Sequence, residues 1–265
     1  MGRRTLEQLS KETKRSEKTL RTIFKKFLDN PPAIKIKPHK DCHLMIDGTY
    51  FKRNFCFANY IDNDLKYSQL ADIILRENFT DAIRHLELLK NSGLDIASIT
   101  SDGHKSLIKA VKAILPEVIH QRCIVHIQRM SFNYLTKHPK TQAGKDLRSL
   151  VKILHEINSF EKRDIWIKLF NKWILKYDSF LKERSYSISG RWWYAHKLLR
   201  RTRSLIKNAL PNMFHYLNNP KIPKSTNGLE TRFSFLKNDV KIHRGMTREH
   251  RKSFILYYIF YKNNP

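Results

Sequence analysis

The sequence predicts a mixed α/β protein in which a short pair of helices precedes the sheet and a long helical segment interrupts it. Apolar runs bounded by turn residues recur between residues 43 and 121, as expected for strands alternating with helices. Helical periodicity without a convincing strand fills residues 124–218. A proline-marked stretch over residues 30–38 separates all of this from the N-terminal helices.

The net charge of the chain indicates which class of partner to expect. The 265-residue chain carries a formal net charge of +27 at pH 7. An excess of that size and sign favours a polyanion, and nucleic acid before any other. A ribosomal-type or merely soluble basic protein is the alternative. Because 41% of the residues are hydrophobic, an ordered core is expected rather than a disordered basic tail.

Three cysteines without a paired CxxC motif give no disulfide framework and fit a reducing compartment. The chain begins with charged, helically periodic residues rather than with a signal peptide. The apolar run over residues 253–261 is too short to span a bilayer. We therefore expect a cytoplasmic, nucleoid-associated protein with no membrane partner.

The N-terminal segment, residues 1–30, has the pattern of a helix-turn-helix. Thr5 and Gln8 have the spacing of a capping box, and Ser16 begins a second helix. The second helix has an apolar face and an opposite basic face, and the basic face offers DNA contacts through Lys18, Arg21 and Lys25. A hairpin that merely packs on the main domain remains the alternative. Residues 31–40 are predicted to be a linker, and residues 41–265 the main domain.

Within the main domain, strands are predicted over residues 43–47, 54–61 and 66–75. A helix capped by Thr80 should follow, then a strand that ends at Asp102, a helix over residues 105–115 and a strand over residues 117–121. The first strand is expected to stop at Asp47, with the chain turning away at Gly48. A helical insertion is placed at about residues 127–222, before two C-terminal helices.

Three acids from distant segments are candidates for a two-metal site: Asp47, Asp102 and Glu230. Asp47 and Asp102 each end an apolar strand, and Glu230 lies in the first turn of a predicted helix. Paired divalent cations held by carboxylates catalyse phosphodiester chemistry, and Mg²⁺ prefers such oxygen ligands. Each acid also has a plain interpretation, because Asp-Gly is a common turn and Glu230 suits a helix cap.

Cys123 and His126 form a C-x₂-H pair. A structural zinc ion needs four ligands, and no second paired motif is nearby in the sequence, which argues against zinc. A buried thiol and imidazole that fix the helix after the sheet fit better, and ordinary packing is the default for such a pair.

Basic and aromatic residues later in the chain offer further DNA contacts. Arg191 and Trp192 lie in a G-R-W-W-Y stretch that is suited to base stacking and phosphate contact. Tryptophan pairs are more often helical core, and at least one of Trp192 and Trp193 is expected there. Basic residues that follow Glu230 form either a phosphate-binding surface or a solvated face. The candidates among them are Lys237, Lys241 and Arg244.

Taken together, these stretches resemble the catalytic region of bacterial insertion-sequence transposases of the Mutator-like DDE group. The resemblance runs from about Lys40 to the C-terminus. The matching stretches are residues 44–51, 99–106, 121–129, 191–194, 222–237 (I-P-K-S-T-N-G-L-E-T-R-F-S-F-L-K) and 242–246.

The resemblance implies an RNase H-like fold with an all-α insertion between the second acid and the glutamate. It implies that Asp47, Asp102 and Glu230 are the catalytic residues, holding two Mg²⁺ or Mn²⁺ ions, and that Cys123 and His126 are the family's C-x₂-H signature. It also associates the Trp192 region with strand handling.

The function expected from this resemblance is DNA transposition: cleavage at the ends of the element and transfer of the 3′-hydroxyl into target DNA. DNA with terminal inverted repeats would be the partner, and a homodimer would bring two ends together. A decayed or truncated, transposase-derived protein that binds DNA without cutting it remains the alternative. A nuclease that cuts without joining is a second rival.

Overall fold

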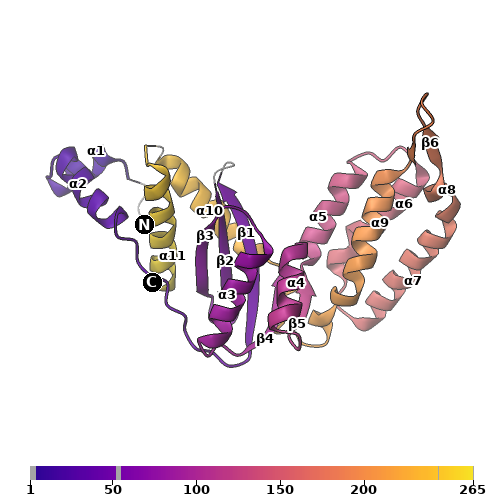
Figure 1. The fold of residues 1–265 in the computed structure, drawn as a ribbon, viewed down its shortest axis with the longest axis horizontal. Helices are drawn as coiled ribbons and strands as arrows, with labels where there is room; N and C mark the ends of the chain where they lie inside the picture. The colour runs from indigo at the N-terminus through magenta and orange to yellow at the C-terminus, as the bar shows by residue number, and fades with distance from the viewer. Residues whose placement is uncertain (1–3, 52–54, 244, 265) are drawn as a thin grey trace.

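The computed structural model describes residues 4–51, 55–243 and 245–264. Within them, five strands form one mixed sheet in the order β3-β2-β1-β4-β5 (Figure 1). Strands β1, β2 and β3 pair antiparallel, whereas β1, β4 and β5 pair parallel. In chain order they are β1 (Cys42–Phe51), β2 (Phe55–Asp62), β3 (Tyr67–Ile74), β4 (Ile96–Ser101) and β5 (Ile119–Arg122).

Helices cover both faces of this sheet. Strand alternation sends Leu44 and Ile46 to one face, where they pack with α3 and α4. It sends Met45 to the other face, where Phe57 stacks edge-on against Phe233 of α10. The covering helices are α3 (Phe79–Asn91), α4 (Lys105–Ile114), α10 (Asn227–Ile242) and α11 (Arg248–Asn263).

The segment between β5 and α10 builds a separate apolar core beside the sheet, on the side away from α10 and α11 (Figure 1). Trp166, Phe170 and Trp173 stack in series at its centre and are almost fully buried. Its helices are α5 (Ile124–Leu135), α6 (Gln142–Lys152), η1 (Ile153–Glu156), α7 (Phe160–Lys176), α8 (Asp178–Lys182), α9 (Lys197–Ala209), η2 (Leu210–Asn212) and η3 (His215–Leu217).

This segment is not entirely helical, which corrects the prediction of an all-α insertion. It contains a two-stranded hairpin of β6 (Arg184–Tyr186) and β7 (Trp192–Tyr194). The turn between them is possible because Gly190 takes a φ of +76° and donates its backbone N–H to the Ser187 carbonyl. The aromatic residues of β7 favour an extended strand over the helix that their helical neighbours suggested.

The N-terminal helices α1 (Leu6–Thr13) and α2 (Glu17–Leu28) begin as predicted. Thr5 and Gln8 form the capping box, and Ser16 caps α2. The pair packs at the far side of α11, where the Phe27 ring meets the Tyr257 ring edge-on (Figure 1). Their role in DNA binding and the domain boundaries stay predictions.

Two further details differ from the sequence prediction. Strand β1 does not end at Asp47 but continues to Phe51, because Gly48 and the residues after it pair with β2. Helix α3 is capped by Asn78, whose side chain accepts the Asp81 N–H, rather than by Thr80. None of the described helices is long and apolar enough to cross a membrane.

Candidate active site

The pairing register brings three predicted residues to one edge of the sheet. Ile46 of β1 pairs with Ser101 of β4, and Ser101 pairs with Arg122 of β5. The residues directly after these three are Asp47, Asp102 and Cys123. Because these strands run parallel, their carboxyl ends meet at the same edge, where ligand sites of α/β sheets occur.

Asp47 lies within β1 rather than at its end, and its side chain is partly buried. Its Oδ1 atom accepts the backbone N–H of Gly48 at 2.9 Å. Across the antiparallel ladder it faces Asn59, which is fully buried and whose amide atoms have no hydrogen-bond partner among the described residues. The two side chains share the sheet face that packs on α10.

Asp102 lies in the loop after β4, and Arg122 fixes the course of this loop. The Arg122 guanidinium donates to the Asp102 carbonyl at 3.1 Å, and the Asp102 Oδ1 accepts the His104 N–H at 2.8 Å. Gly103 has a φ of +79°, and a Cβ at this position would lie 1.8 Å from the Arg122 Nε. Glycine adopts this φ without strain and leaves room for the Arg122 side chain.

Glu230 reaches the site from the first turn of α10. Its carboxylate forms a group with Asp47 and His126 in which one ligand atom from each residue lies within 4.8 Å of the others. The His126 Nε2 lies 3.3 Å from the Glu230 Oε1, and the Arg129 guanidinium binds both carboxylate oxygens at 2.8 Å each. Glu230 makes these contacts across the site, so it does not act as a helix cap.

Asp102 is not a member of that three-residue group. Its charge nevertheless acts on Asp47, on Glu77 and on His126. The structure thus brings Asp47 and Glu230 together directly, whereas Asp102 acts on Asp47 through its charge.

Cys123 fixes the start of the helix that carries Glu230. Its Sγ accepts the backbone N–H of Thr226, the residue just before α10, at 3.3 Å, and the Thr226 Oγ1 lies 3.3 Å from the His126 Nδ1. Nearby, Ile124 donates its N–H to the Lys224 carbonyl. The C-x₂-H pair therefore joins the sheet edge and α5 to α10, although Cys123 and Thr226 are 103 positions apart in sequence.

The site concentrates opposing charges. Burial raises the pKa of the Asp47 carboxyl to about 7; the nearby charge of His126 opposes this, while those of Asp102 and Glu230 add to it. Burial would lower the pKa of His126, but its contact with Cys123 and the surrounding carboxylates raise it to about 9. Burial would also raise the pKa of the Cys123 thiol, yet His126 and Thr226 leave it below its usual value. The protonated imidazole thus offsets part of the negative charge.

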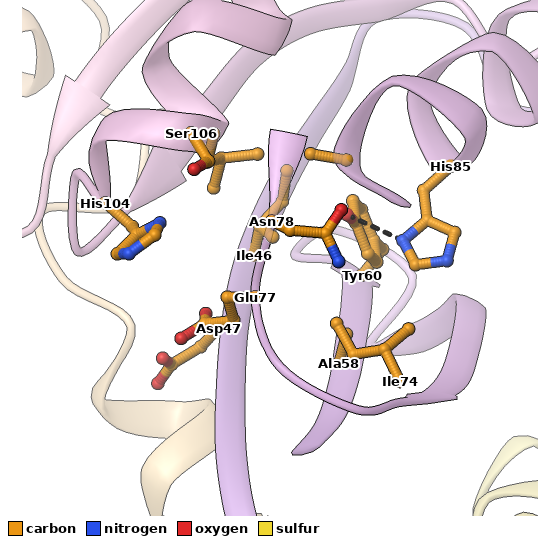
Figure 2. Close-up of a pocket in the computed structure, with 12 residues that line it drawn as sticks. Ile46, Asp47, Ala58, Tyr60, Ile74, Glu77, Asn78, His85, His104 and Ser106 are labelled. Carbon is orange, nitrogen blue, oxygen red and sulfur yellow. Dashed lines mark hydrogen bonds between the residues drawn. The ribbon is translucent and has the colours of Figure 1, made fainter. Parts of the chain in front are cut away.

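A fourth acid beside Asp47 was not predicted. Glu77 lines a pocket together with Asp47 and His104 (Figure 2). Its Oε1 approaches Gly48 so closely that a Cβ there would lie 2.7 Å away, and its Oε2 accepts the Tyr50 hydroxyl at 3.4 Å. Burial, and then the charge of Asp102, raise the pKa of Glu77. The strand order could have predicted this position. Glu77 follows β3, and β3 runs in the same direction as β1, so both strands lead to the same edge of the sheet.

A second group of possible metal ligands lies at the opposite end of β1 and comprises His39, Cys42 and Asp62. The Asp62 carboxylate is already occupied. It accepts hydrogen bonds from His39 and Gln69 and from the backbone of the turn that follows β2. We interpret this group as a structural network that closes the turn.

A sequence model described as "Transposase, Mutator family" matches residues 71–241, well over half of the chain. The chain belongs to this transposase family. The matched range contains Asp102, Cys123, His126 and Glu230, and it begins after Asp47.

Among curated relatives of this Mutator-family chain is the transposase for insertion sequence element ISRM5 from Rhizobium meliloti (strain 1021). It is 24% identical over 180 residues, which are 64% of this chain and 42% of the relative. The chain thus spans less than half the length of that protein.

Two solved structures are similar at a low level. One is the HTLV-2 integrase catalytic core domain in complex with magnesium, with a TM-score of 0.26 and 15% identity, covering 47% of this chain and 90% of that one. The other is a simian T-cell lymphotropic virus intasome in complex with PP2A regulatory subunit B56 gamma, with a TM-score of 0.25 and 14% identity, covering 49% and 54%. TM-scores of this size do not establish a shared fold.

The DNA-binding residues predicted for this Mutator-family chain lie on three separate surfaces. Lys18, Arg21 and Lys25 are exposed on α2, where Arg21 also contacts Glu17. Lys237 and Lys241 are exposed on α10, beyond Glu230. Arg244 lies outside the described residues.

Arg191 and Trp192 lie on the β6–β7 hairpin, distant from the acidic site (Figure 1). Trp192 and Trp193 are 45% and 46% exposed, so neither is the helical core residue that was expected. The Arg184 guanidinium lies 4.1 Å above the Trp192 ring, which gives the aromatic surface a positive charge. The buried tryptophans of this segment are Trp166 and Trp173.

Proposed function

We propose that this Mutator-family chain cleaves DNA at the ends of an insertion element and joins the freed 3′-hydroxyl to target DNA. Asp47, Asp102 and Glu230 are the proposed catalytic residues. The observation that carries the proposal is the convergence of Asp47 and Glu230, from β1 and α10, within 4.8 Å of each other and of His126. Convergent carboxylates in a basic protein suit phosphodiester chemistry.

The donor atoms fit a divalent metal ion. Mg²⁺ needs few protein carboxylates because it keeps several water ligands, and Mn²⁺ prefers the same oxygen donors. Bound divalent ions would activate the attacking oxygen and stabilise the leaving oxygen. The chain itself contributes the fixed positions: Gly48 orients Asp47, Arg122 holds the Asp102 loop, and Cys123 anchors the start of α10.

The mixed sheet supports assignment to the RNase H-like folds, which the family resemblance implies. Three antiparallel strands are followed by two parallel ones, with β1 at the centre and Asp47 on it. The segment that builds its own core between β5 and α10 is the proposed insertion.

The proposed DNA contacts are made by three basic surfaces: α2, the β6–β7 hairpin and the outer part of α10. The net charge of +27 supports a polyanionic partner. We propose that the helix pair acts as a helix-turn-helix on the terminal inverted repeats, and that two copies of the chain act together because two element ends must be joined.

Replacement of Glu230 with glutamine tests the proposal. Glu230→Gln preserves shape but removes the charge, and we expect Mg²⁺-dependent cleavage of duplexes from the element ends to fall by at least about 100-fold. Glu161→Gln is the matched control, because Glu161 is also a first-turn acid but lies exposed on α7. The control should cleave at the parental rate.

Three results would contradict the proposal. Unchanged cleavage by Glu230→Gln would remove Glu230 from the site. A parental protein that binds DNA with or without metal and never cuts would be a DNA-binding protein. A protein that cuts but cannot join a pre-cut end to target DNA would be a nuclease.

A further inference from the structure

Arg129 binds Glu230 by both of its terminal nitrogens. The Nη1 donates to Oε1 and the Nη2 to Oε2, each at 2.8 Å. Arg129 lies one helical turn beyond His126 on α5, so both side chains reach the same carboxylate. The Arg129 side chain is 52% exposed, and that of Glu230 is 25% exposed.

This contact competes with metal binding, because a bidentate guanidinium uses one in-plane lone pair on each carboxylate oxygen, the pair through which a carboxylate would chelate a cation. A divalent ion at Glu230 would also lie a few ångströms from the positive charge of Arg129, and like charges repel strongly at that distance. Arg129 in this geometry therefore weakens the binding of a divalent ion by Glu230.

Arginine stays charged at any physiological pH, so a displaced Arg129 needs another anion. Its side chain is 52% exposed, so solvent lies on one side of it. The planar fork that fits the Glu230 carboxylate also fits a phosphate. In a protein that acts on DNA, the anion at this place is the DNA backbone.

We propose that Arg129 exchanges Glu230 for a backbone phosphate of DNA when divalent metal enters the site, which makes Arg129 a substrate-binding residue. This inference rests on the function proposed above. In the DNA-free protein Arg129 neutralises Glu230, and with metal bound it holds the DNA.

A permanent structural ion pair is the competing explanation. However, α5 and α10 are already connected through the Cys123–Thr226 contact and the hydrogen bond from Ile124 to Lys224. Half-exposed ion pairs add little to such a connection. The pair is therefore not needed to position α10.

Manganese binding to the DNA-free, full-length protein tests the competition. Arg129→Gln should bind Mn²⁺ more tightly than the parental protein, by roughly two- to fivefold, the factor that removal of a half-exposed ion pair supplies. Electron paramagnetic resonance of free Mn²⁺ gives the affinity. Arg163→Gln is the control, because Arg163 pairs with an aspartate on α7, outside the site, and should leave Mn²⁺ affinity unchanged.

DNA cleavage tests the second half of the exchange. Despite its tighter metal binding, Arg129→Gln should cleave element ends about 10- to 100-fold more slowly. Arg129→Lys keeps the charge but not the planar guanidinium, so its cleavage rate should lie between those of the parental protein and Arg129→Gln. Weaker or unchanged Mn²⁺ binding by Arg129→Gln would overturn the exchange, and so would parental cleavage by this variant.

Glu230→Gln separates failure of the exchange from failure of the proposed function. Loss of Mn²⁺ binding in Glu230→Gln, together with unchanged binding in Arg129→Gln, would overturn the exchange and leave the proposed function standing. Undiminished Mn²⁺ binding in Glu230→Gln would overturn the proposed function and the exchange with it. Circular dichroism of each variant confirms that it is folded.

Discussion

Asn59 lies in an energetically unfavourable environment. It is fully buried on the central part of the sheet, and within the described part of the chain neither atom of its amide has a hydrogen-bond partner. Burial of an amide without a partner destabilises a fold. Asn59 lies directly opposite Asp47, on the face that packs on α10. Polar groups kept at such a cost are typical of functional sites.

Replacement of Asn59 with leucine should therefore separate stability from activity. Without the buried amide, the free energy of unfolding should rise by about 1 kcal/mol. The neighbour of Asp47 would no longer orient groups in the site, and Mg²⁺-dependent cleavage should fall by about 10- to 100-fold. Urea unfolding and the cleavage assay measure the two effects.

Ser68 provides the matched control for Asn59. Its hydroxyl is also buried and lacks a partner among the described residues, but it lies on β3, next to the C-terminal end of α11. Ser68→Ala should stabilise the protein without slowing cleavage. An Asn59→Leu protein that is less stable than the parent, or that cleaves as fast, would contradict the functional interpretation of Asn59.

Some residues of the candidate site could be predicted from the sequence and others could not. Asp47 and Asp102 each follow an apolar run and precede glycine, a local pattern that made both of them candidates, although β1 continues past Asp47. Arg129 and Asn59 show no local pattern. Their roles depend on which face of α5 meets α10 and on which residue of β2 pairs with Asp47.

Helix α3 is connected to the sheet by a charged contact. Asp72 of β3 accepts hydrogen bonds from the His85 Nε2 at 2.8 Å and from the Arg84 Nη2 at 2.6 Å. The Nδ1 atom of His85 in turn meets the Tyr60 hydroxyl, as Figure 2 shows. The hydrogen bond with His85, above all, holds the pKa of the Asp72 carboxyl well below its usual range.

Asp72→Asn should destabilise the protein in a pH-dependent way. A carboxyl whose pKa is lowered by folding stabilises the fold above its unfolded pKa of about 3.9, and this contribution is lost as the pH falls below that value. We expect a loss of about 1–3 kcal/mol near pH 7, because a partly buried partner is left unpaired. The difference between variant and parent should shrink as the pH falls below about 4.

Urea unfolding of Asp72→Asn and of the parent across this pH range measures the effect. Asp164→Asn is the control, because Asp164 forms an exposed pair with Arg163 on α7 and should change stability by less than about 1 kcal/mol at every pH. A difference for Asp72→Asn that grows toward acid pH would contradict the assignment.

Among the helices and strands, those whose sequence pattern lies within a few consecutive residues were predicted best. The caps of α1 and α2 were found because Thr5, Gln8 and Ser16 act within their own turns. The β6–β7 hairpin was missed because three-residue strands flanked by long helices give too short a pattern. The continuation of β1 past Gly48 was missed because it depends on pairing with β2.

At the scale of the molecule, the helix pair and the insertion lie on opposite sides of the sheet (Figure 1). Helix α2 is held against α11 by the hydrogen bond between the His250 Nε2 and the Asp29 carboxylate, 2.8 Å apart, and by the hydrogen bond from the Tyr257 hydroxyl to the Asn30 carbonyl. Lys18, Arg21 and Lys25 of α2 remain exposed. The helix pair thus presents a basic surface from a fixed position.

A triple change on this surface tests whether the helix pair reads DNA. Replacement of Lys18, Arg21 and Lys25 with glutamine should weaken binding of full-length protein to duplexes from the element ends. If all three residues contact phosphates, the slope of log affinity against log salt should decrease by about 2–3.

The control replaces three exposed lysines of α7 with glutamine and removes the same charge: Lys162, Lys168 and Lys172. Fluorescence anisotropy at about 50 to 200 mM salt gives both slopes. Equal losses in the two triple variants would mean that the whole charge of the chain, rather than α2, attracts the DNA.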